Sequence, residues 1–87
     1  METTDLETAR EWQATVQKIY ADNLLWLEFW PGEDMRILAR RARYQLIKAA
    51  VQVSKLEGNT DPVYALSVLY QVPEHHRLSH LLNKPAA

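Results

Sequence analysis

The sequence predicts an all-α fold: a long antiparallel two-helix hairpin followed by two shorter helices, together a small helical bundle. Apolar residues recur at alternating steps of three and four on both sides of the break at Trp30-Pro31-Gly32, which places each set on one helical face. Folding the chain back at this break aligns both sets in one register. The predicted seam consists of Ala9, Trp12, Val16, Ile19, Asn23, Trp26 and Trp30 facing Met35, Ala39, Ala42, Leu46, Ala49, Val53 and Leu56.

Composition indicates one small globular domain spanning residues 1–87, with 47% hydrophobic residues. A formal net charge of −1 predicts no overall attraction to nucleic acid or to anionic membranes. Cysteine is absent, so disulfides and thiolate metal sites are excluded. The acidic start of the chain is unlike a secretion signal, and no apolar run approaches the ~20 residues of a membrane span. We therefore expect a cytoplasmic protein without membrane contact.

The first helix is expected over residues 5–30, because Thr4 and Glu7 have the spacing of a capping box. Its end, residues 24–30, is apolar on nearly every side, and a helix of that character has to be enclosed. The second helix can cover only one side. Leu25 and Phe29 are therefore expected to contact either the C-terminal third of the chain or another protein.

The second helix is expected over residues 34–57, after the break at Pro31-Gly32, with Gly58 as its left-handed C-terminal residue. Large residues of the first helix face alanines of the second, as Trp26 faces Ala39. This size match predicts a closed seam in which Trp26 is buried.

Asp61 and Pro62 have the order of a helix cap and a first helical residue, which predicts a third helix over 62–71 that is buried on nearly all sides. Pro73 can begin a fourth helix over 74–82, whose inward face would carry three leucines, Leu78, Leu81 and Leu82. Residues 83–87 are expected to form a loose tail.

No residue pattern indicates catalysis or a cofactor. His76 and His80 have a spacing at which two imidazoles can share a metal, but the metalloprotease glutamate is missing and such pairs are common on solvated faces. The chain has two glycines, Gly32 and Gly58, and both end helices, which leaves no phosphate-binding loop. We therefore assign no catalytic, cofactor-binding or metal-ligating residue and expect a protein that is not an enzyme.

Charge is the feature that stands out, because the second helix is basic whereas the first is acidic. Its cations form two clusters: Arg36, Arg40 and Arg43, and Arg41, Lys48 and Lys55. Between them lies an apolar stripe of Ile37, Tyr44, Ile47 and Val51. Either the C-terminal helices pack over this stripe, with the cations flanking the contact, or part of it stays free for a partner.

Two resemblances bear on these alternatives. Trp30-Pro31-Gly32 between two helices resembles the hairpin of the small secreted WXG-type proteins, although here the break comes early and two further helices follow. The basic second helix is similar in architecture to the small helical subunits of CRISPR surveillance complexes, which would imply a nucleic-acid path along it.

The function expected from the sequence is protein–protein interaction, as a subunit, adaptor or inhibitor of a larger complex, with a protein partner or a second copy bound. The alternative is a nucleic-acid-binding subunit of a ribonucleoprotein that uses the basic second helix. Candidate binding residues in either case are Leu25, Phe29, Arg36, Arg40, Arg41, Arg43, Tyr44, Lys48 and Lys55.

Overall fold

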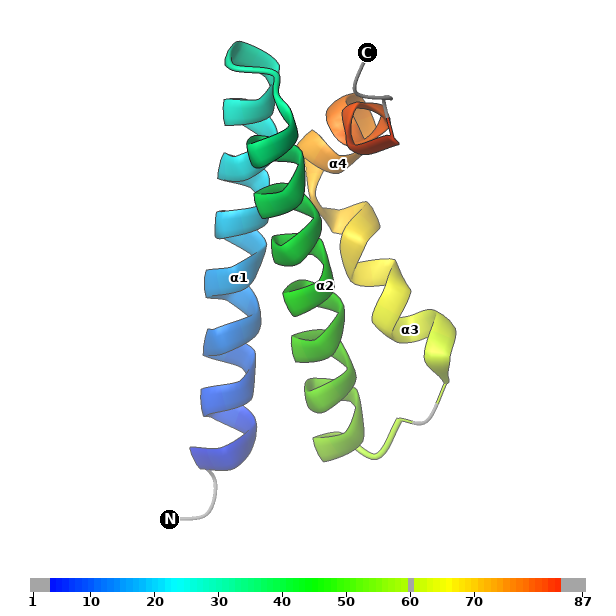
Figure 1. Cartoon of the computed structure of the whole chain (residues 1–87). Coiled ribbons are helices and arrows are strands. Elements are labelled where there is room, and N and C mark those ends of the chain that lie inside the picture. Colours follow the sequence, from blue (N-terminus) through cyan, green and yellow to red (C-terminus); the bar gives the residue numbers. More distant parts are fainter. Residues whose placement is uncertain (1–3, 60, 84–87) are drawn as a thin grey trace.

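A computed structural model describes residues 4–59 and 61–83, and within these ranges every element is helical (Figure 1). In chain order the elements are α1 (Thr4–Phe29), α2 (Glu33–Leu56), α3 (Pro62–Ser67), the 3₁₀ helix η1 (Val68–Gln71), α4 (Pro73–Leu78) and the 3₁₀ helix η2 (Ser79–Asn83). The predicted all-α fold, with two long and two short helices, is confirmed. Of the predicted tail, Asn83 lies in η2, and residues 84–87 lie outside the described ranges.

The end of α2 follows the predicted chemistry. Gly58 has a positive φ of 81°, the left-handed conformation that glycine adopts without a steric penalty. The Gly58 N–H donates to the Lys55 carbonyl at 3.1 Å, and the Asn59 N–H donates to the Ser54 carbonyl at 2.9 Å. These two bonds form a Schellman motif, which satisfies carbonyls that would otherwise be free at the helix end.

The start of α3 is also capped as predicted. The Asp61 carboxylate accepts a hydrogen bond from the Val63 N–H at 3.0 Å, and Pro62 occupies the first helical position. The capping box expected at Thr4 concerns a side chain that lies outside the described part of the chain.

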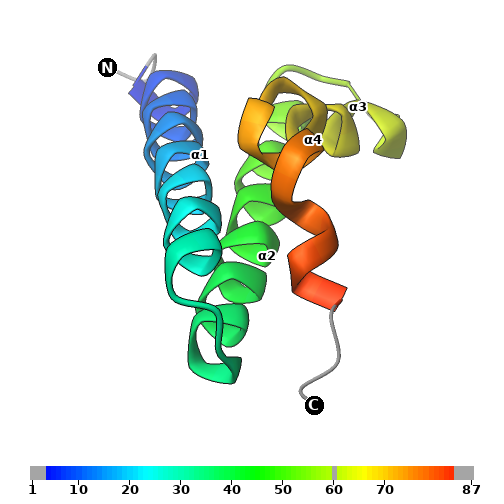
Figure 2. The ribbon, with the colours of Figure 1, turned by 90° about the horizontal axis from the view of Figure 1, so that it is seen from above.

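Residues 62–83, here called the C-terminal arm, cross one face of the α1–α2 hairpin (Figures 1 and 2). The α3 and η1 segments contact α2, α4 contacts α1, and η2 contacts both long helices. The core between arm and hairpin contains Val16, Tyr20, Leu24, Leu27, Ala39, Ala42, Leu46, Ala50, Ala65, Val68, Leu69, Val72, Leu78 and Leu82. The result is an elongated bundle with extents of 49 × 23 × 18 Å.

The predicted seam is right for most of α2, although its last member, Leu56, is 41% exposed, and it is wrong for part of α1. Its α2 members Ala39, Ala42, Leu46, Ala49 and Val53 are all buried. In α1 Val16 is buried as predicted, but the buried stripe continues through Tyr20, Leu24 and Leu27, and Trp26 is 52% exposed. Trp26 is therefore not enclosed against Ala39.

The reason lies in the composition of α1 between residues 24 and 30. This segment is apolar on nearly every side, so the same periodicity fits two neighbouring stripes, and spacing alone does not choose between them. The arm makes the choice, because it covers the side of α1 that carries Tyr20 and Leu24, both fully buried.

The arm itself is more exposed than predicted. Val63 is 66% exposed and Tyr70 is 64% exposed, whereas Ala65, Val68 and Leu69 face the hairpin and are buried. A short helix on the outside of a two-helix layer has only one neighbouring surface, so only one of its faces is covered.

We predict that Leu24→Ala destabilises the protein more than Trp26→Ala. Leu24 is fully buried, and emptying such a site costs about 2–5 kcal/mol. Half of the Trp26 side chain already contacts water, so its loss should cost only about 1–2 kcal/mol. Urea unfolding at low protein concentration measures both losses. A larger loss for Trp26 than for Leu24 would restore the seam that the sequence alone predicts.

Candidate functional site

The three tryptophans of the chain are all exposed; Trp12 and Trp26 lie on α1, and Trp30 directly follows its last residue. The exposed fractions are 51% for Trp12, 52% for Trp26 and 60% for Trp30, and Ile19 between them is 44% exposed. Trp12, Ile19 and Trp26 follow each other at seven-residue steps, which brings them to one side of the helix. A stripe of large apolar side chains therefore faces water along α1.

A second, less apolar stripe runs along α2. Leu38 is 47% exposed and Leu56 is 41% exposed. Gln45 and Gln52, which follow Leu38 at seven-residue steps, are exposed as well. These residues flank the buried alanines of α2 on the side away from the arm.

The two stripes meet along the hairpin. Trp12 lines one hollow of about 520 Å³ together with Gln52 and Leu56 of α2. Further along, the Asn23 side-chain amide donates to the Leu38 carbonyl at 3.5 Å. We define the tryptophan face as Trp12, Ile19, Trp26, Trp30, Leu38, Gln45, Gln52 and Leu56.

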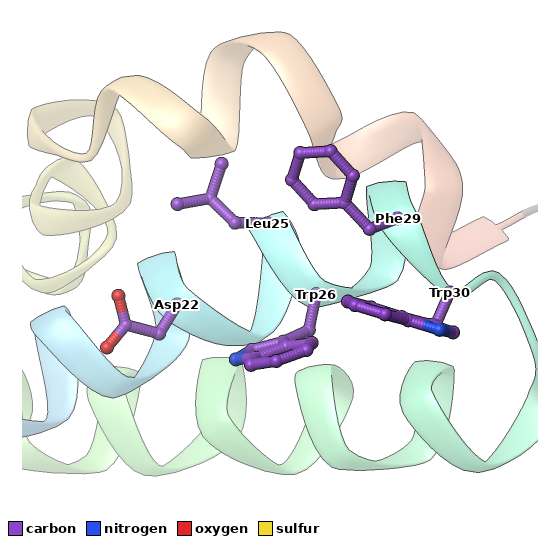
Figure 3. A pocket seen from close by; sticks show the side chains of 5 residues that line it. All are labelled: Asp22, Leu25, Trp26, Phe29 and Trp30. Carbon is purple, nitrogen blue, oxygen red and sulfur yellow. The ribbon is translucent and has the colours of Figure 1, made fainter.

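The end of this face is hollowed around Trp26 and Trp30. Their ring centroids are 4.8 Å apart, and the hollow has a volume of about 380 Å³ (Figure 3). Trp26 and Trp30 lie on the α2 side of the hollow, whereas Leu25 and Phe29, which line it as well, point away from α2 (Figure 3). Of these two predicted binding residues, Leu25 is half-buried against the core, and Phe29 is 70% exposed. Asp22 supplies the hollow's one charged group.

The edges of the tryptophan face carry opposite charges. On the outer side of α1 lie Glu11 and Asp22, and on the outer side of α2 lie Arg41, Lys48 and Lys55, all of them exposed. Between these edges the face residues are uncharged. An apolar centre with a charged rim is the usual composition of a protein-binding surface.

The three arginines of the first predicted basic cluster differ in burial: Arg36 is buried, Arg43 is half-buried and Arg40 is exposed. Arg36 is buried and donates to the Glu33 carboxylate through Nε at 3.2 Å and Nη2 at 2.9 Å. Arg40 donates to the Leu82 carbonyl of the arm through both Nε, at 3.1 Å, and Nη2. Arg43 is half-buried, and its charge acts on Tyr20 and on a histidine of α4. These arginines hold the arm and the start of α2.

The second predicted cluster remains in water. Arg41, Lys48 and Lys55 follow each other at seven-residue steps and are exposed. Tyr44 beside them is 59% exposed, with the Lys48 ammonium 5.5 Å from its ring centroid. A hollow of about 310 Å³ lies between Ile37, Tyr44 and the neighbouring arginines.

The expectation that the C-terminal helices cover the stripe from Ile37 to Val51 is wrong for most of that stripe. Ile47 is half-buried against the core, but Ile37 is 39% exposed and Val51 is 37% exposed. The arm packs instead on Leu46 and Ala50, which lie on the neighbouring face of α2.

A cluster of aromatic and histidine side chains fixes the arm to α1. The Tyr20 hydroxyl lies 2.7 Å from His75 Nδ1, and the Tyr70 and His76 rings pack on His75 at 5.7 and 6.2 Å between centroids. Burial raises the pKa of Tyr20 to about 12, although the Arg43 charge opposes this rise. Burial lowers the pKa of His75, and the charges of His76 and Arg43 lower it further.

His76, one of the two histidines with metal-ligand spacing, hydrogen-bonds through Nε2 to the Tyr70 carbonyl at 2.8 Å. Across residues 4–59 and 61–83, no three histidine or carboxylate side chains gather as a metal site would require. No helix in the same ranges is long and apolar enough to cross a membrane.

Comparison of the chain with protein-family models, with curated proteins and with solved structures finds no match. Its function has to be argued from its own surface. The sequence reasoning missed the tryptophan face because it placed Trp12, Ile19 and Trp26 in the seam. The sequence does contain a second apolar stripe on α1, Tyr20, Leu24 and Leu27, which could have indicated that these residues are buried in place of the tryptophans.

We predict that the protein loses stability as the pH falls below about 6.5. The unfolded chain binds a proton at His75 near the ordinary pKa of 6.5, whereas the folded chain binds it only at lower pH. The unfolded state therefore binds more protons in this window, which favours unfolding. Stability is full above the window and is lost as the pH falls through it.

The variant His75→Gln should reduce the dependence of the unfolding free energy on pH, as measured by urea unfolding between pH 7.5 and about 5. The exposed His80→Gln is the matched control and should leave the wild-type dependence in place. An equal slope in wild type and His75→Gln would refute the assignment to His75.

Proposed function

We propose that this protein acts through protein–protein interaction, as a non-enzymatic subunit, adaptor or inhibitor within a larger complex, and that it binds through the tryptophan face. The observation that carries the proposal is the alignment of two exposed tryptophans, Trp12 and Trp26, on one side of α1, with exposed Trp30 directly after its end. Large apolar side chains that gather on one exposed face are typical of an interaction site. Tryptophan is also among the residues that contribute most to binding energy at interfaces.

The surroundings of the face support the same function. Its centre is uncharged, its rim is charged, and the α1–α2 hairpin beneath it is held by the buried residues of the core. A fully enclosed tryptophan buries roughly 150–250 Å², and a partner would cover the half or more of each side chain that is still exposed. Binding on regular helices also costs little ordering entropy, because the side chains are presented by a rigid element.

We predict that Trp12→Ser combined with Trp26→Ser abolishes the binding of those proteins that co-purify with the untagged chain. The matched control is Val63→Ser combined with Leu66→Ser, which removes exposed apolar residues of the arm. Quantitative co-purification compares the two variants, and far-ultraviolet circular dichroism checks that both are folded. If both variants lose the same proteins, or neither does, the tryptophan face is not the binding surface.

The second candidate, a nucleic-acid-binding subunit, is favoured by the row of Arg41, Lys48 and Lys55 beside Tyr44. It is weaker because Arg36 is buried against Glu33 and Arg40 is hydrogen-bonded to the Leu82 carbonyl of the arm. Three cations that contact phosphates would give a salt dependence with a slope of about −2 to −3 in a double-logarithmic plot.

We predict that the protein shows no salt-dependent affinity for nucleic acid. Titration of labelled single-stranded RNA, single-stranded DNA and duplex DNA with the protein, starting at about 50 mM salt, measures it. A salt-dependent affinity that falls in the variant with Arg41, Lys48 and Lys55 changed to Gln would instead establish the second candidate.

A further inference from the structure

We propose that the partner of the tryptophan face is a second copy of this chain, packed about a two-fold axis parallel to the helices. In this arrangement α1 of each copy lies on α2 of the other, and the two C-terminal arms lie on the outer sides. The inference rests on the proposed function, since it names the occupant of the same surface. Symmetric pairs that use one patch twice are the commonest assemblies of soluble proteins.

The charges of the two helices favour this axis over the alternative. Along the edges of the tryptophan face, α1 carries Glu11, Lys18 and Asp22, whereas α2 carries Arg41, Lys48 and Lys55. The proposed axis places the acidic helix of one copy on the basic helix of the other. An axis perpendicular to the helices would place α1 on α1 and α2 on α2, so that like charges meet, which is unfavourable.

The register can be followed from the hydrogen bond between Asn23 and the Leu38 carbonyl. An axis parallel to the helices keeps every residue at its own height along the bundle. Asp22, next to Asn23 on α1, therefore lies within about two helical steps (~3 Å) of Arg41 in the second copy. Both side chains lie on the outer edges that this axis brings together, so they form a rim pair twice in the dimer.

Two further sets of contacts follow from the same register. Glu11 falls between the heights of Lys48 and Lys55 of the second copy, which gives another acidic–basic rim contact. Lys18 lies within about two helical steps of Arg41 in the second copy as well, and this like-charged approach is reduced because Asp22 already lies 3.8 Å from the Lys18 ammonium.

The size of the face is sufficient for a stable pair. The α2 helix has 24 residues, so the face is about 36 Å long and, at two helix diameters, about 20 Å wide. It therefore offers roughly 700 Å² per copy, close to the ~800 Å² per partner of a standard specific interface. The apolar centre of the tryptophan face in one copy would be covered by the tryptophan face of the other copy.

We predict that the full-length chain is a dimer by sedimentation equilibrium at micromolar concentrations. All tryptophans of the chain lie on this face, so their fluorescence reports on it alone. Emission should shift to the blue, and acrylamide quenching should weaken, as the concentration rises. Trp12→Ser with Trp26→Ser should be monomeric while its helicity, checked by circular dichroism, is retained.

Charge reversal tests the arrangement. Asp22→Lys and Arg41→Glu should each weaken dimerisation about tenfold at low salt, because two attractive rim pairs become repulsive. The chain that carries both changes should dimerise as the wild type does. Glu28→Lys, the same charge change on the arm side of α1, is the matched control and should have no effect.

Each other outcome decides against the proposal. If the chain is monomeric throughout, or if the double reversal does not restore dimerisation, the second copy is not the partner in this arrangement. If a different protein then binds in a manner that depends on Trp12 and Trp26, the proposed function stands without self-association. If neither self-association nor any other binding depends on them, both are wrong.

Discussion

The contact between the C-terminal arm and the hairpin determines which surface of this protein is open. Two long helices in antiparallel contact have two exposed faces, and the arm covers only one of them. Tyr20 lies at the centre of that contact, fully buried, with its hydroxyl 2.7 Å from His75. Arg40 adds a second polar link, to the last turn of the arm. Because the arm selects the side with Tyr20 and Leu24, the side with the tryptophans is left to water.

The sequence predicts much of this fold because its strongest signals are local. Gly58 ends α2 with the conformation only glycine adopts easily, and Asp61 with Pro62 begins α3, so both boundaries follow from neighbouring residues. The buried face of α2 is also predictable, since alanines and Leu46 form one stripe among charged residues. Fold class and helix order can therefore be predicted from local sequence, without knowledge of the tertiary packing.

The open surface could not be predicted in the same way, because it depends on packing between distant segments. In α1 the apolar stripe of Trp12 and Trp26 and the stripe of Tyr20 and Leu24 have equally good periodicity. Only the position of the arm separates them. The basic residues show the same limit: Arg40 and Arg41 are neighbours in sequence and both exposed, yet Arg40 bonds the arm whereas Arg41 lies at the edge of the tryptophan face.

The composition of α1 explains why covering only one side of its C-terminal end leaves apolar side chains in water. Between residues 24 and 30 the helix is apolar on nearly every side, and such a helix is stable only when it is enclosed. The α2 helix covers one side and the arm covers a second, through Leu24 and Leu27. The third side carries Trp26 and Trp30, and a basic helix laid on it would both remove the rings from water and meet the acidic edge of α1. The α2 helix of a second copy has both properties, so the arm and the second copy would act as equivalent covers on opposite faces of one hairpin.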